Sequence, residues 1–138
     1  MSGPIRIILV DDHDLVRESW KQLLNNDPKF KVIAVLKNGT EAIEQSINLL
    51  PDIILMDINM TPVNGFEATE KILSSVPSAK IIGISVNNNP RYSAKMLSLG
   101  AKGFVTKTST LNELKKAILR VHGGETYVCE EIRKKDRQ

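Results

Sequence analysis

The sequence predicts an α/β fold, a doubly wound parallel sheet of five strands with helices on both faces. Short runs of β-branched and apolar residues alternate with longer segments whose apolar residues recur at helical spacing. This alternation repeats five times, and strictly alternating strands and helices form a parallel sheet that the helices cover. The length of 138 residues suits one domain with one core.

The first strand–helix unit shows the pattern clearly. Residues 5–10 form an apolar run of the kind found in a buried strand. Residues 14–25 follow, with Trp20 and Leu24 on one apolar helical face. We expect Asp14 to be the N-cap of this helix, because a short acidic side chain can accept a hydrogen bond from its first turn.

Glycine and proline mark most of the later boundaries. Pro51 precedes the third strand, Gly65 precedes the third helix, Gly100 closes the fourth helix and Gly123 stops the fifth. The later strands are expected at residues 31–36, 52–57, 80–85 and 102–106. The later helices are expected at residues 40–50, 66–76, 90–99 and 111–122.

Composition indicates an ordinary cytoplasmic protein that has no contact with a membrane. Apolar residues make up 41% and charged residues 25% of the chain, and no apolar run approaches the roughly 20 residues of a membrane span. Residues 1–4 show no signal peptide, and the single cysteine, Cys129, fits a reducing compartment. The net charge of +3 is spread along the chain, which favours a solvated mixed surface over a nucleic-acid face.

Polar side chains follow four of the five predicted strands. Asp11 and Asp12 come after the first strand, Asp57 ends the third, Ser85 ends the fourth, and Lys107 follows the fifth. The carboxyl ends of parallel strands share one edge of the sheet, where ligands bind near the switch point in strand order. We therefore expect these five side chains to converge, because four separate loops rarely present such groups together by chance.

This set of side chains suits phosphoryl chemistry. Clustered carboxylates repel one another unless a cation lies among them, and Mg²⁺ prefers oxygen ligands. Asp57 can act as a nucleophile toward an activated phosphoryl group. Lys107 can balance charge on the phosphoryl oxygens, and Ser85 can donate a hydrogen bond to one of them. His13, beside the acidic pair, is expected to face solvent or to support the ligands.

The pattern resembles the receiver domain of response regulators over about residues 5–122. The resemblance implies a flavodoxin-like (βα)5 fold with strand order 2-1-3-4-5. The motifs that carry the resemblance are Val10-Asp11-Asp12-His13, Asp52 to Met60, Gly65, Ser85 and Gly100 to Lys107. The residues in and around these motifs are most similar to those of the NarL/LuxR-type subfamily.

The resemblance also implies roles for the site residues. Asp57 would be the phosphorylation site. Asp12 and Asp57 would bind Mg²⁺ through their side chains, Asp11 largely through water, and Asn59 through its backbone carbonyl. Lys107 would contact the phosphoryl group. Some intrinsic autophosphorylation and autodephosphorylation would accompany this chemistry, in a signalling domain rather than an enzyme.

The implied switch involves Ser85 and Phe104. Ser85 would move toward the phosphoryl group, and Phe104 would swing inward as Ser85 leaves its resting position. Val86 stands where a smaller residue is usual and would narrow access to the site. Phe104 replaces a commoner tyrosine, so this switch would act through packing alone.

The resemblance sets expectations for partners and domains. A sensor histidine kinase would donate the phosphoryl group, and phosphorylation could drive homodimerisation. Residues 1–124 would be the receiver domain and residues 125–138 the start of a linker to a helix-turn-helix domain absent from this chain, through which DNA is bound. Cys129 would be an incidental residue of that linker. A stand-alone receiver, or a pseudo-receiver that works without phosphorylation, is the alternative.

Two other functions fit the residues poorly. A hydrolase of the aspartate-nucleophile type needs a second carboxylate two residues after Asp57, where this chain has Asn59. A nucleotide-binding module needs a glycine-rich loop after the first strand, where this chain has Asp11 and Asp12.

Overall fold

The computed structural model describes residues 3–137 and contains one sheet of parallel strands. The strands lie in the order β2-β1-β3-β4-β5-β6. The prediction of five strands was wrong by one, because a short sixth strand adds to the β5 edge. The strands are β1 (Ile5–Val10), β2 (Phe30–Leu36), β3 (Ile53–Asp57), β4 (Ile81–Ser85), β5 (Gly103–Thr106) and β6 (Tyr127–Val128).

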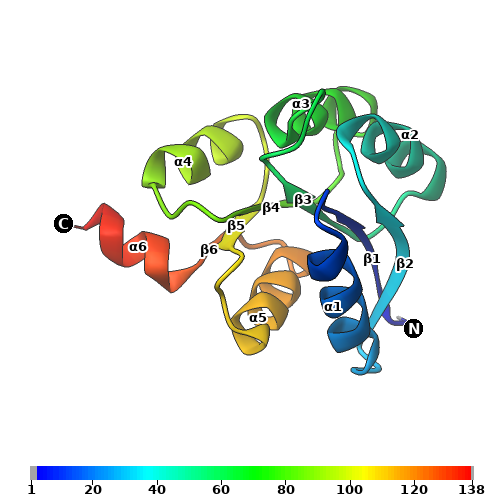
Figure 1. Cartoon of the computed structure of the whole chain (residues 1–138), viewed down its shortest axis with the longest axis horizontal. Coiled ribbons are helices and arrows are strands. Elements are labelled where there is room, and N and C mark those ends of the chain that lie inside the picture. Colours follow the sequence, from blue (N-terminus) through cyan, green and yellow to red (C-terminus); the bar gives the residue numbers. More distant parts are fainter. Residues whose placement is uncertain (1–2, 138) are drawn as a thin grey trace.

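Helices cover both faces of this sheet. In Figure 1, α1 and α5 lie on one face, and α2, α3 and α4 lie on the other. All five predicted helices are present with ends within one residue of their expected positions. The helices are α1 (Asp14–Asn25), α2 (Gly39–Leu49), α3 (Gly65–Ser75), α4 (Pro90–Ser98), α5 (Leu111–His122) and α6 (Glu130–Asp136).

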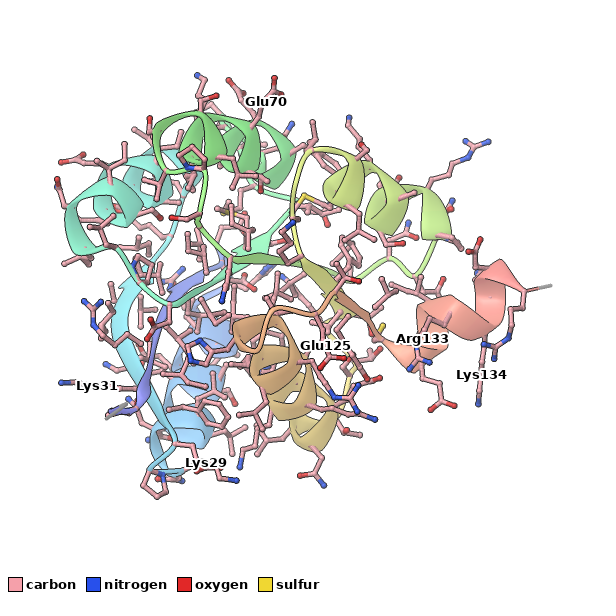
Figure 2. All side chains as sticks on the ribbon, turned by 180° about the vertical axis from the view of Figure 1, so that it is seen from behind. Lys29, Lys31, Glu70, Glu125, Arg133 and Lys134 are labelled. Atoms are coloured by element: carbon pink, nitrogen blue, oxygen red, sulfur yellow. The ribbon has the colours of Figure 1, made fainter. Side chains whose placement is uncertain are left out.

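The core lies between the sheet and its helices. Every residue of β3 and β4 is buried, as expected for central strands covered on both faces. Charged side chains instead point outward from several sides of the molecule, as Figure 2 shows for Lys29, Glu70 and Lys134. None of the helices within residues 3–137 has the length and apolar character needed to cross a membrane.

The N-cap prediction for α1 was wrong by one residue. His13 occupies the N-cap position and makes no side-chain capping hydrogen bond. Asp14 is instead the first helical residue, and its carboxylate contacts the Arg17 guanidinium one turn later. Arg17 also donates a hydrogen bond of 2.6 Å to the Asp11 carbonyl oxygen, so it anchors the loop that carries the acidic residues.

The C-terminal segment folds back against the sheet. Residues of β6 pair with β5, and the Tyr127 hydroxyl donates a hydrogen bond of 2.9 Å to Glu113 on α5. Cys129 and Ile132 are buried beside α4 and β5. The expectation that Cys129 is an incidental linker residue was therefore wrong.

Strand order also locates the crevice expected in such folds. The strand β1 lies between β2 and β3, so the crossover from β1 to β2 and the crossover from β2 to β3 run in opposite directions along the sheet. The carboxyl ends of β1 and β3 lie at this switch point, where open α/β sheets bind their ligands. Asp11, directly after β1, and Asp57, the last residue of β3, lie there.

Candidate functional site

Two buried carboxylates and one ammonium group form the centre of the site. Asp11 and Asp57 are both 0% exposed. The Lys107 Nζ atom lies 3.0 Å from Asp11 Oδ2 and 3.2 Å from Asp57 Oδ2. Lys107 comes from the loop after β5, so residues that are far apart in the sequence meet at the edge of the sheet.

Asp12 and His13 form the outer part of this cluster. The His13 Nδ1 atom lies 3.0 Å from Asp11 Oδ1, 3.1 Å from Asp12 Oδ1 and 3.0 Å from Lys107 Nζ. Both side chains are partly exposed to solvent. The expected supporting position of His13 agrees with these contacts, and its imidazole is a further charged or polar group in direct reach of the acidic pair.

The surroundings of Asp57 raise its pKa above the ordinary value for aspartate. Burial is the largest cause, because a low-dielectric environment disfavours the charged carboxylate. The Asn59 N–H, which donates a 2.9 Å hydrogen bond to Asp57 Oδ1, acts in the opposite direction. The negative charge of Asp11 raises this pKa further, and Lys107 lowers it. One lysine thus compensates only partly for two buried acids.

The backbone around Asp57 is held by a close approach of α3. A Cβ atom built on Gly65 would lie only 2.3 Å from the Asp57 carbonyl oxygen. The Gly65 N–H also donates a 3.2 Å hydrogen bond to the Ile58 carbonyl oxygen. Glycine at position 65 therefore lets the start of α3 support the end of β3, which fixes the position of the Asp57 carboxylate.

The two predicted switch residues are both fully buried. The Ser85 hydroxyl donates a 3.2 Å hydrogen bond to Asn59 Oδ1 and accepts a 3.0 Å hydrogen bond from the Asn87 N–H. Phe104 packs close to Gly83, where an added Cβ would lie 2.7 Å from the ring. Phe104 already lies inside the protein in this structure. Its inward swing on phosphorylation stays a prediction. The neighbouring Val86 is 68% exposed.

The donor atoms of the cluster suit a divalent cation. Asp11, Asp12, His13 and Asp57 each offer one ligand atom, and these atoms lie within 4.8 Å of one another. The Asp11 Oδ2 atom is buried and has no hydrogen-bond partner of good geometry, although Lys107 lies near it. Three carboxylates are hard oxygen donors of the type that Mg²⁺ selects. The residues present therefore fit a magnesium site.

The chain belongs to the response regulator receiver domain family, whose model matches residues 7–119. The fold, the acidic residues after β1, the aspartate at the end of β3 and the lysine after β5 are the features described above. This family consists of signalling domains of two-component systems, so the expected class of protein is confirmed.

The relatives with similar sequences are longer than this chain and are named as response regulators or regulatory proteins. The chain is 41% identical over 128 residues to the transcriptional regulatory protein LnrK of Bacillus subtilis, covering 93% of this chain and 58% of LnrK. It is 35% identical to the response regulator GacA of Pseudomonas viridiflava, covering 93% of this chain and 60% of GacA. The chain thus spans about 60% of the length of these relatives.

Solved structures of the same type superpose closely. A LuxR-family two-component response regulator from Aurantimonas sp. SI85-9A1 has a TM-score of 0.92 at 31% identity, covering 98% of this chain and 99% of that one. The receiver domain of NarL from Mycobacterium tuberculosis has a TM-score of 0.85 at 29% identity, covering 90% of this chain and 100% of that one. The expected likeness to the NarL/LuxR type is confirmed.

Proposed function

We propose that this chain accepts a phosphoryl group on Asp57 in a reaction that requires Mg²⁺. The observation that carries the proposal is the buried Asp57 carboxylate, held 3.2 Å from Lys107 and beside Asp11. A rigidly held carboxylate can attack an activated phosphoryl group and form an acyl phosphate. The donor would be a phosphohistidine on a sensor histidine kinase, as the family implies.

The side chains around Asp57 have distinct roles in this reaction. Asp11, Asp12 and Asp57, with the Asn59 carbonyl, would hold the Mg²⁺ ion, which supplies positive charge to the phosphoryl oxygens when bound. Lys107 compensates the charge of the ionised acids before transfer and contacts the phosphoryl oxygens after it.

The hydrogen bonds of Ser85 support the proposal that phosphorylation changes the conformation of this site. Its hydroxyl now bonds to Asn59, and it would exchange this partner for a phosphoryl oxygen on Asp57. The new charge on Asp57 would thereby bias a two-state element, with Phe104 adjusting by packing. Such a site would also support slow autophosphorylation from small donors and autodephosphorylation.

The output of this switch is proposed from the relatives. Two of the longer relatives are named transcriptional regulatory proteins. We therefore propose a DNA-binding helix-turn-helix domain after residue 138 as the output of the switch. In this proposal residues 1–124 are the phosphoacceptor domain and residues 125–138 begin the connection. Homodimerisation on phosphorylation and a cytoplasmic location complete the proposal.

Intact mass after incubation with acetyl phosphate and Mg²⁺ tests the acceptor chemistry. The wild type should gain about 80 Da, the mass of one phosphoryl group, and the gain should disappear with chelator or in Asp57→Asn. Glu130→Gln, which neutralises an exposed acid on α6, is the matched control and should gain the same mass as the wild type. A wild type that gains no mass, and does not bind the phosphate mimic beryllofluoride either, would favour a pseudo-receiver.

A further inference from the structure

One carboxylate on the C-terminal helix connects two loops of the receiver. Glu131 accepts a 2.7 Å hydrogen bond from Asn88 Nδ2 in the loop between β4 and α4. It also accepts hydrogen bonds from the hydroxyls of Thr106 at 3.0 Å and Thr108 at 3.2 Å, at the end of β5 and just after it. Lys135 adds a 2.9 Å hydrogen bond to Asn88 Oδ1, so two residues of α6 bind the same amide.

Both loops carry residues of the phosphoacceptor site. Thr106 is fully buried and directly precedes Lys107. Asn88 follows Ser85 by three residues, and the intervening Asn87 N–H is bonded to the Ser85 hydroxyl. Each hydrogen bond that Glu131 accepts from these loops therefore comes from a residue one to three positions away from a group that would contact the phosphoryl oxygens.

We propose that Glu131 is a positioning residue for the phosphoacceptor site and that docking of α6 is coupled to phosphorylation of Asp57. The coupling rests on the proposed function and adds to it a regulatory role for the C-terminal segment. Glu131 acts through Asn88 and Thr106 and does not touch the reacting atoms.

The direction of the coupling follows from the present position of Ser85. Its hydroxyl is bonded to Asn59, and in this arrangement Asn88 reaches Glu131. A move of Ser85 toward a phosphoryl group on Asp57 draws Asn87 and Asn88 with it, because the Asn87 N–H is bonded to the Ser85 hydroxyl. Glu131 therefore stabilises the unphosphorylated arrangement, and phosphorylation loosens α6. Because such coupling is reciprocal, release of α6 favours phosphate binding by the same factor.

Surface contacts on α6 supply a matched control for this role. Glu130 precedes Glu131 on the same helix, but its carboxylate is exposed and lies 3.5 Å from Lys134 on the outer side of α6. Figure 2 shows Lys134 pointing away from α4. Glu130→Ala therefore removes the same charge from the same helix without touching either loop.

The single cysteine provides a direct probe of docking. Cys129 lies at the N-terminal end of α6 and is 0% exposed, so a thiol reagent reaches it only when the segment opens. In the wild-type chain, beryllofluoride with Mg²⁺ should accelerate the reaction of Cys129 by about 5- to 150-fold, the usual size of such coupling. Glu131→Ala should react fast without beryllofluoride and change little when it is added, whereas Glu130→Ala should behave like the wild type.

A second variant approaches the same contact from the other side. Asn88→Ala should also speed the reaction, and the double variant Asn88→Ala/Glu131→Ala should add little to either single change, because the two residues share one interaction. Glu131→Ala should bind beryllofluoride tighter by the factor that separates its Cys129 rate from that of the wild type. Thermal melts of the variants would show that all remain folded.

Three results would overturn the proposal or part of it, and they are distinguishable. If acetyl phosphate labels Asp57 but beryllofluoride leaves the wild-type Cys129 rate unchanged, the coupling alone is wrong. If neither labelling nor beryllofluoride binding occurs, the proposed function fails and the coupling fails with it. Equal Cys129 rates in Glu131→Ala and Glu130→Ala would also refute the role of Glu131.

Discussion

Two polar clusters meet at the consecutive residues Thr106 and Lys107, and they are built in opposite ways. Lys107 reaches inward to Asp11 and Asp57, two acids with no exposed surface. Thr106 donates outward to Glu131, an exposed acid that accepts several hydrogen bonds from neutral donors. In the first cluster, Lys107 compensates the negative charge of the two carboxylates only partly. In the second cluster, the Glu131 carboxylate accepts hydrogen bonds from three side chains of the protein.

The pKa directions of the two carboxyl groups express this difference. Burial raises the pKa of Asp57, whereas the hydrogen bond from Asn88 lowers the pKa of Glu131 below its ordinary value. Hydrogen bonds to the charged form stabilise it, and desolvation without full compensation destabilises it. The buried cluster therefore carries negative charge that its lysine offsets only in part and that a bound cation would offset further, whereas the outer carboxylate is stabilised by donors of the protein itself.

The largest expected effect comes from Gly65→Ala, which breaks the support of the buried cluster. The new Cβ would lie 2.3 Å from the Asp57 carbonyl oxygen, so backbone must shift. We expect a loss of about 3 kcal/mol in the free energy of unfolding, measured by urea denaturation. Gly123→Ala is the control, because its Cβ would meet no atom closer than 3.4 Å. Equal stability of the two variants would show that α3 does not support the end of β3.

Magnesium should have the next largest effect, and it should act on the buried cluster alone. A ligand present at 100 times its dissociation constant stabilises the folded state by about 2.7 kcal/mol. The wild type should gain this stability in thermal melts with Mg²⁺, and Asp11→Asn should lose most of the gain. Glu130→Gln should keep it. A full gain in Asp11→Asn would place the ion elsewhere.

A smaller effect is expected where the C-terminal segment is anchored. Tyr127→Phe removes the hydroxyl that donates to Glu113 Oε2. The free energy of unfolding, measured by urea denaturation, should therefore fall by about 1 kcal/mol. Tyr92→Phe is the matched control, because within residues 3–137 the Tyr92 hydroxyl makes no hydrogen bond and its ring stacks on Phe66. Should both changes cost the same, the Glu113 contact would contribute nothing to docking.

The smallest effects are pH slopes of opposite sign in the metal-free protein. Asp57 has a raised pKa, so the folded state binds more protons than the unfolded state above pH 3.8, and stability falls as pH rises through that window. Glu131 has a lowered pKa, so its contribution is present above pH 4.5 and is lost as pH falls toward the folded value.

Chemical denaturation across this pH range, in chelator, measures both slopes. Asp57→Asn should flatten the fall in stability above pH 3.8, and Glu131→Gln should flatten the loss at lower pH. Slopes of the same sign for the two acids would contradict the comparison between the two clusters.

Sequence patterns predicted the receiver framework closely. The five main strands and five main helices have ends within one residue of their predicted positions, because long apolar periods and glycine boundaries specify them. The segment β6–α6 was missed, since a two-residue strand and a short charged helix have no such period.

The central residues of the site were also predictable from the sequence. Asp11, Asp57 and Lys107 were expected at one edge because parallel strands bring their carboxyl ends together, and the structure places them in contact. Glu131 could not be predicted, because it lies in a run of mixed charge where no spacing distinguishes it from Glu130. Its contacts depend on tertiary docking of α6, which local sequence does not encode.

Locating the phosphoryl group tests the central claim most directly. Borohydride reduces an aspartyl phosphate to homoserine, so peptide mapping after acetyl phosphate, Mg²⁺ and borohydride treatment identifies the modified acid. We predict homoserine at position 57 in the wild type and none at positions 11 or 12. Conversion of Asp11 or Asp12 instead, with Asp57 intact, would contradict the assignment of Asp57 as the acceptor.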